Sequence, residues 1–231
     1  MVNNKLIESS YLARYIFLNS VDISDYKVFP SRDIQNSPPV YRFSLPENSE
    51  ALLPIFNQVV SANTKQPQTE TTDQLLERNG TTAFLVIKND QLLFEQYYNG
   101  YNHASICTSF STVKSIVSAL IGIALHDGLI HQLDDPITKY LPELTAPHWS
   151  AIIIRHLVSM SSGLGYNERG FLPWDDQPRI YYTPDIRQLA RQARRIELPA
   201  IWFHYNNYNL VLLGMILERV AGSTVSAYLQ E

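Results

Sequence analysis

The chain has 231 residues, of which 45% are hydrophobic and 17% charged, so its composition is that of a globular protein with ample core material. A formal net charge of −4 and the lack of a basic stripe in the sequence argue against a nucleic-acid partner. The single cysteine, Cys107, excludes an intrachain disulfide. The six histidines lack metal-ligand spacing, so we expect no metal and no other cofactor.

The longest apolar run, residues 116–125, has about half the length that a helix needs to cross a bilayer. The first residues also lack the basic segment and the apolar stretch of an export signal. We therefore expect a cytoplasmic protein, or a periplasmic one if an upstream export segment has been removed.

The first third of the chain lacks a long periodic pattern. Residues 1–70 are interrupted by prolines and by a polar stretch, which predicts an extended arm wrapped around a core. Within this arm we predict one short helix at about residues 50–61. Residues 71–231 are predicted to form the main domain.

Two β-rich runs, residues 82–88 and 91–98, are joined by Asn89-Asp90, which predicts a hairpin with a two-residue turn. A helix follows at about residues 109–127 and ends at Gly128. This helix is apolar on nearly every side, so we expect it to be buried.

The second half of the chain predicts shorter elements. A short helix is expected at residues 153–160, and a loop rich in Trp, Tyr and Pro at residues 172–184. The arginines of residues 187–195 have helical spacing and predict a solvated helix face. A further helix at residues 209–220 ends at Gly222, after which Ser223 or Thr224 caps another helix.

A serine and a lysine lie three residues apart at the start of the long apolar helix. This spacing puts the Ser111 hydroxyl and the Lys114 amine on one helix face, one turn apart. A lysine in that position can take the proton of the serine if burial lowers the lysine pKa. The alternative is a helix-capping serine beside a surface lysine.

A second polar motif, Tyr205-Asn206-Asn207, precedes the helix at residues 209–220. The hydroxyl of Tyr205 can shuttle a proton when a lysine amine lies nearby. The amide of Asn207 offers donors and an acceptor to a polar substrate or to the lysine. His204, next to the tyrosine, is a further candidate.

Four ordered stretches of the chain resemble class C β-lactamases and related serine hydrolases, a group that includes esterases, D-aminopeptidases and 6-aminohexanoate-dimer hydrolases. These stretches are residues 81–100, 108–144, 153–166 and 203–222. The N-terminal arm, with Asp25-Tyr26-Lys27 and Phe-Pro-Ser-Arg at residues 29–32, looks most like the 6-aminohexanoate-dimer-hydrolase branch. The resemblance implies an α/β (α+β) fold of the β-lactamase/transpeptidase type, in which a helical region flanks an antiparallel sheet.

The resemblance also implies roles for individual residues. Ser111 matches the family nucleophile and Lys114 its activating partner. Tyr205 matches the tyrosine that acts as general base and then as general acid, and Asn207 matches the substrate-binding asparagine of that motif. The implied reaction proceeds through an acyl-enzyme, with the backbone N–H of Ser111 as one oxyanion donor.

The family carries a third motif, often Lys-Thr-Gly or His-Thr-Gly, and no such tripeptide occurs in this sequence. We therefore expect the N-terminal part of a hydrolase that lacks the C-terminal strands of the fold. The hairpin at residues 82–98 would then have an unpaired edge. Candidate partners are a C-terminal complement chain and a second copy in a homo-oligomer.

The substrate expected for such a hydrolase is a small molecule with an amide or ester bond. Trp174 and Tyr181 are predicted to border its site, although core packing explains such aromatics equally well. Asp175-Asp176 is either a solvated turn or a cation site for an amine-bearing substrate.

The alternative to a serine hydrolase is a catalytically silent binding or scaffold module with the same fold. An α/β-hydrolase with a Ser-His-Asp triad is excluded because the sequence has no Gly-x-Ser-x-Gly elbow.

Overall fold

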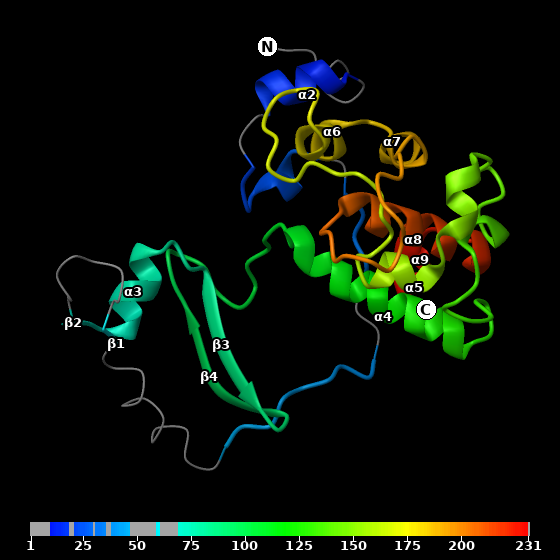
Figure 1. The fold of residues 1–231 in the computed structure, drawn as a ribbon. Helices are drawn as coiled ribbons and strands as arrows, with labels where there is room; N and C mark the ends of the chain where they lie inside the picture. The colour runs from blue at the N-terminus through cyan, green and yellow to red at the C-terminus, as the bar shows by residue number, and fades with distance from the viewer. Residues whose placement is uncertain are drawn as a thin grey trace. The chain divides into compact units, whose positions relative to one another are not determined.

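The computed structural model describes residues 10–18, 21–29, 31–35, 38–46, 59–60 and 69–230. The chain divides into two compact units, one of residues 1–35 and 108–231 and the other of residues 36–107 (Figure 1). The predicted division into an arm of residues 1–70 and a domain of residues 71–231 stays a prediction. No helix in the described part of the chain is long and apolar enough to cross a membrane.

The unit of residues 36–107 contains the predicted hairpin. Strand β3 (Ala83–Lys88) pairs antiparallel with β4 (Gln91–Tyr97), so that Lys88 faces Gln91 next to the turn. The two turn residues, Asn89 and Asp90, have φ angles of 51° and 59°, as a tight hairpin turn of matching twist requires. The hairpin prediction is therefore confirmed.

Three further short elements belong to the same unit. Helix α3 (Thr72–Arg78) starts at a capping box in which Thr71 and Gln74 bond reciprocally, a signal that the sequence prediction missed. Strand β1 (Val59–Val60) pairs with β2 (Thr69–Glu70). The helix predicted near residues 50–61 is thus wrong at Val59–Val60, and its other positions lie outside the described residues.

The N-terminal residues of the helical unit are more ordered than an extended arm. Helix α2 (Tyr11–Phe17) is capped by Ser10 and packs against α6 (Asp176–Tyr182). A 3₁₀ turn, η1 (Asp25–Lys27), follows. The purely extended arm is therefore wrong for these residues, because their aromatic side chains pack on α6.

The long apolar helix forms where it was predicted. It consists of the 3₁₀ turn η3 (Phe110–Thr112) and helix α4 (Val113–His126), and Gly128 follows with a φ of 74°. One face of α4 is buried and packs against helix α8 (Asn207–Ala221). The prediction that this helix is buried on nearly every side is wrong, because Ile116 and Ile123 expose 41% and 49% of their surfaces.

Helix α8 packs against four other helices of the helical unit (Figure 1). These are α4, α5 (Ile154–Val158), α7 (Ile186–Arg191) and α9 (Val225–Gln230). Helix α8 ends at Gly222 with a φ of 65°, and Thr224 caps α9, as predicted.

The loop predicted at residues 172–184 is wrong in its middle part, because residues Asp176–Tyr182 form helix α6. Its start is fixed by tertiary contacts, because the Tyr208 hydroxyl donates to Asp176 at 2.6 Å.

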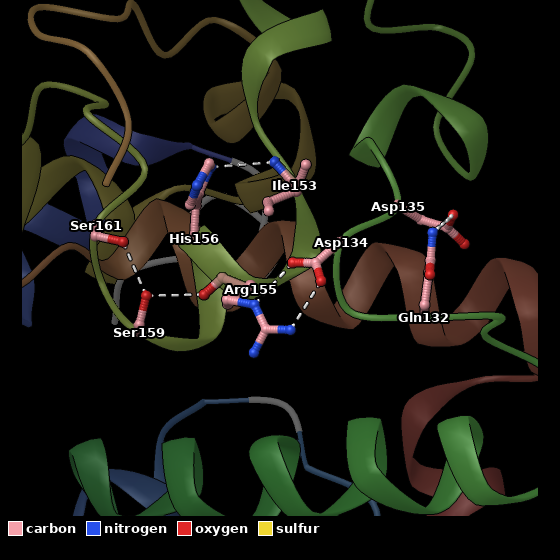
Figure 2. A network of polar contacts seen from close by, with 8 residues as sticks. All are labelled: Gln132, Asp134, Asp135, Ile153, Arg155, His156, Ser159 and Ser161. Atoms are coloured by element: carbon pink, nitrogen blue, oxygen red, sulfur yellow. Dashed lines mark hydrogen bonds and ion pairs between the residues drawn. The ribbon is translucent and has the colours of Figure 1, made fainter. Parts of the chain in front are cut away.

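Two 3₁₀ turns, η4 (Ile137–Lys139) and η5 (Pro147–Ala151), connect α4 to α5. Polar contacts around α5 are drawn in Figure 2. Arg155 donates two bonds to Asp134, at 2.7 and 2.9 Å, and the Ile153 N–H donates to Nδ1 of His156 at 3.3 Å. These contacts fix α5, and the loop that leaves its C-terminus leads to the predicted site.

Candidate active site

Two loops that are distant in sequence hold Tyr205 beside the start of α8. The N–H of Ala200 donates to the Ser161 carbonyl, and the N–H of His204 donates to the Met160 carbonyl, both at 2.8 Å. Asn206, which is only 1% exposed, donates from Nδ2 to the Leu164 carbonyl at 2.9 Å. The Asn206 side chain also caps α8, so it fixes both the loop and the helix start.

Close approach between these loops requires a glycine. Gly163 has a φ of 72°, and a Cβ atom there would lie 2.3 Å from the carbonyl oxygen of Glu197. Any other residue would therefore push the two loops apart. His204 belongs to the same arrangement, since its Nε2 lies 3.0 Å from the Tyr166 carbonyl oxygen.

Ser111 lies in the turn that leads into α4, and its side chain is exposed. Lys114 donates from Nζ to the Ser111 Oγ at 2.9 Å, across one helical turn. The residue before the serine, Phe110, has a φ of 45°, which is uncommon for a bulky side chain. Such backbone strain is often found at functional sites, where it fixes the direction of a reactive group.

The lysine also reaches the tyrosine of the second motif. The Nζ of Lys114 lies 4.7 Å from the centre of the Tyr205 ring, within the range of a cation–π contact. Among the described residues, the Tyr205 hydroxyl has no hydrogen bond to Ser111 or Lys114. Hydrogen bonds of an empty site often tighten only when substrate binds.

Asn207 is held by two residues that the sequence analysis did not single out. Its Nδ2 donates to the Tyr166 hydroxyl at 2.7 Å and to Oε1 of Gln177 at 3.2 Å. The Tyr166 hydroxyl in turn donates to Gln177, and burial raises the pKa of this tyrosine. Tyr166 is the last residue of the stretch 153–166 that carries the family resemblance, but nothing local in the sequence points to Gln177, which lies in the segment predicted as a loop.

A cavity of about 320 Å³ opens beside Ser111. Its polar lining consists of Ser111, Lys114, Gln177, Tyr181 and Asn207. The rest of the lining is apolar: Val21, Phe110, Val113, Ile180, Ile186, Leu210 and Val211. The structure therefore places two of the predicted substrate-binding residues, Tyr181 and Asn207, in the same cavity as the serine and the lysine.

The third predicted substrate-binding residue, Trp174, does not line this cavity. It is 68% exposed and borders a separate hollow with Tyr11 and Arg179. The carboxylates that follow it have structural partners: Asp175 accepts from the Leu172 N–H, and Asp176 accepts from Tyr208. The two residues therefore lie at the start of α6 with protein partners for both carboxylates, and the solvated turn predicted for Asp175-Asp176 is wrong.

Comparisons with known proteins identify the class of this fold. A profile of the β-lactamase family matches residues 69–231, so the chain belongs to the β-lactamase family. This confirms the resemblance described above.

Two relatives carry names that bear on its chemistry. The chain is 28% identical over 165 residues to the 6-aminohexanoate-dimer hydrolase of Paenarthrobacter ureafaciens, covering 65% of this chain and 41% of the relative. It is 28% identical over 120 residues to the β-lactamase of Escherichia coli K12, covering 52% of this chain and 30% of the relative. The chain therefore spans less than half the length of either relative.

A solved structure supports the fold assignment. The proposed 6-aminohexanoate-dimer hydrolase of Bacillus anthracis superimposes with a TM-score of 0.71 and 22% identity, over 97% of this chain and 60% of that structure. The fold is thus of the β-lactamase type, with helices beside a two-stranded antiparallel sheet in the described residues. The α/β (α+β) prediction is confirmed.

Proposed function

We propose that the protein is a serine hydrolase that cleaves amide or ester bonds through an acyl-enzyme. The observation that carries the proposal is the 2.9 Å hydrogen bond between Lys114 Nζ and Ser111 Oγ, with the centre of the Tyr205 ring 4.7 Å from the same amine. A weak nucleophile and a group that can accept its proton are thus in contact.

The reaction divides into two steps. The Ser111 Oγ attacks the carbonyl carbon of the substrate, and its proton passes through Lys114 and Tyr205 to the leaving amine or alcohol. A C–O bond to Ser111 forms and the C–N or C–O bond of the substrate breaks. Water then attacks the acyl-enzyme, its proton returns by the same groups to Ser111, and the carboxylic acid leaves.

The cavity supports a substrate with an apolar acyl portion and a polar amide. Most of its lining is apolar, while Asn207 and Gln177 provide carboxamide groups that can pair with an amide. Asn207 and Tyr181 are assigned to substrate binding here. A role for Trp174 requires a substrate long enough to extend beyond this cavity. Amide bonds are also the substrates that the name of the Paenarthrobacter relative, a dimer hydrolase of an amino acid, suggests.

The test is covalent labelling of the 231-residue chain with a fluorophosphonate, followed by intact mass measurement. The native chain and Ser115→Ala, which changes an exposed serine one turn further along the sequence, are expected to gain one adduct. Ser111→Ala is expected to gain none. Labelling of Ser111→Ala to the same extent would disprove the assignment.

The same measurement separates the alternatives. A binding module without catalytic function would leave the native chain unlabelled at every concentration. If a second copy completes the site, the labelling rate will rise with protein concentration, in parallel with dimer formation in sedimentation. Labelling independent of concentration would show that one chain carries a reactive site.

A further inference from the structure

The segment of residues 21–29 is attached to the chain just before Ser111. The N–H of Thr108 donates to the Ile23 carbonyl at 2.7 Å, and the N–H of Tyr26 donates to the Thr108 Oγ1 at 3.1 Å. This reciprocal pair holds the segment three residues from the nucleophile. Val21, at its start, reaches the cavity beside Ser111 and contributes to its lining.

Within this segment, Asp25 is an acidic residue that is only 8% exposed. A buried carboxylate is costly unless hydrogen bonds satisfy it. Its Oδ2 accepts from the Asp22 N–H at 3.1 Å and from the hydroxyl of Tyr181, which lies 156 residues away in sequence. Burial and this bond to Asp25 both raise the pKa of Tyr181, so the hydroxyl stays protonated and remains a donor.

The ring of Tyr181 is fixed from two further sides. Phe29, from the same N-terminal segment, meets it edge-on at 5.5 Å, with the ring planes at 88°. Tyr182 meets it at 5.0 Å and 78°. These are favourable aromatic geometries, and together with the bond to Asp25 they hold the ring from three directions. That position is in the wall of the cavity that contains Ser111.

We propose that Asp25 is a positioning residue that holds Tyr181 in the cavity wall, and that Tyr181 in this position determines which acyl groups fit beside Ser111. This inference rests on the proposed function, because it interprets the cavity as the acyl site. The ligand class is a linear apolar chain that ends in a carboxamide. Loss of the bond between Asp25 and Tyr181 frees the ring to move, so the cavity loses its preference for one chain length.

The test measures binding without catalysis, in the Ser111→Ala background. Primary carboxamides from propionamide to decanamide are titrated against the protein, and their dissociation constants are determined by NMR. Asp25→Ala and Tyr181→Phe are each expected to weaken the best-binding amide up to about tenfold, because binding must then order a ring that the native protein already holds in place. Each is also expected to flatten the dependence on chain length.

Three comparisons separate positioning from a general loss of structure. Asp25→Asn retains a carbonyl oxygen that can accept from Tyr181, so it should keep the native preference. Asp25→Ala combined with Tyr181→Phe should be no worse than either alone, because both remove the same bond. Asp22→Ala, an exposed acid of the same segment whose carboxylate bonds only to Ser24 among the described residues, should bind like the parent.

Unchanged affinities in Tyr181→Phe, which conserves the ring and the fold, would overturn the proposal. So would the absence of binding by every amide, or a fully additive double variant. If the native chain fails to react with a fluorophosphonate while the amides bind as expected, the proposed hydrolase activity fails and the positioning role of Asp25 stands.

Discussion

Lys114 is the residue on which the proposed chemistry depends, because one amine contacts both partners. Its Nζ donates to the Ser111 hydroxyl and lies over the face of the Tyr205 ring. The three groups thus form a single cluster, and the proposed mechanism passes the proton of the serine through it. Residues that share one step do not contribute independently to the rate.

This arrangement predicts how variants combine. Lys114→Ala and Tyr205→Phe should each slow fluorophosphonate labelling of Ser111 about 10²- to 10⁴-fold, the usual contribution of general acid–base catalysis. The double variant should be only slightly slower than the worse single variant. Lys88→Ala, at an exposed position of the hairpin, serves as the control and should not change the rate. Losses that multiply in the double variant would show that the two residues act separately.

Asn206 has a structural part in the same site, because its side chain joins two elements. Asn206→Ala removes the cap of α8 and leaves the buried Leu164 carbonyl without its partner. We expect the free energy of unfolding to fall by about 2–3 kcal/mol, measured by urea denaturation. Thr224→Ala removes the cap of α9 and an exposed contact with the Ser226 hydroxyl, and should cost about 1 kcal/mol. Equal losses in the two variants would mean that the bond to Leu164 contributes nothing.

At the scale of elements, helix α5 carries a pH-dependent cap. Nδ1 of His156 accepts from the Ile153 N–H at the start of the helix (Figure 2). Burial lowers the pKa of His156 below its usual value of 6.5. The folded protein therefore binds this proton less readily than the unfolded chain, and its stability decreases as the pH falls from 6.5 towards the pKa in the folded state.

The corresponding prediction uses a glutamine, which can accept the same bond from position N3 of the helix but does not titrate. His156→Gln should keep the stability of the native protein at pH 8 and lose less of it between pH 6.5 and 5. Urea denaturation across this range measures the difference. A matched control is His103→Gln, which changes an exposed histidine in the other compact unit. The same slope in His156→Gln and in the native chain would show that the cap does not depend on the histidine proton.

A second titrating group near α5 acts at lower pH. Hydrogen bonds from Lys139 and Tyr140 lower the pKa of Asp135 to about 2. Its ionised form stabilises the fold above pH 3.8, and this contribution is lost as the pH falls towards 2. The pH range in which Asp135 loses its contribution lies below the range for His156. One series of denaturation measurements across pH therefore separates the two contributions to stability.

Elements with a local signal could be predicted from the sequence, and those fixed from a distance could not. The hairpin turn, the end of α8 at Gly222 and the cap of α9 depend on neighbouring residues. Helix α6 was missed because its start is fixed by Tyr208, which follows it by about thirty residues. The arginines of this segment are largely exposed, as expected, but helical spacing does not reveal that Arg187 also pairs with Glu218 at 2.6 Å.

The same distinction applies to the candidate site. The contact between Ser111 and Lys114 follows from a spacing of three residues on a helix, so the motif suffices to suggest it. Gln177 and Asp25 reach the site only through the tertiary fold. Their neighbours in sequence give no sign of the hydrogen bonds to Asn207 and Tyr181.

At the scale of the whole molecule, the chain consists of two compact units with unlike cores. The helical unit has a continuous core in which Leu212 and Ile216 of α8 are fully buried. In the unit of residues 36–107, the hairpin is a two-stranded sheet in which the rings of Phe84 and Phe94 contact each other, with centres 5.9 Å apart. A two-stranded sheet is only marginally stable, so the units should differ in local stability.

Amide hydrogen exchange of the native chain should therefore be fast in β3 and β4 and slow in α8. Leu212→Ala removes a fully buried side chain, which costs about 2–5 kcal/mol, and should speed exchange in α4, α5 and α8 but not in the hairpin. Phe84→Ala is the reciprocal variant: it breaks the ring pair with Phe94 and should speed exchange in β3 and β4 alone. If Leu212→Ala accelerated the hairpin amides as much as those of α8, the two units would unfold as one cooperative body, and the division of the chain would not extend to its stability.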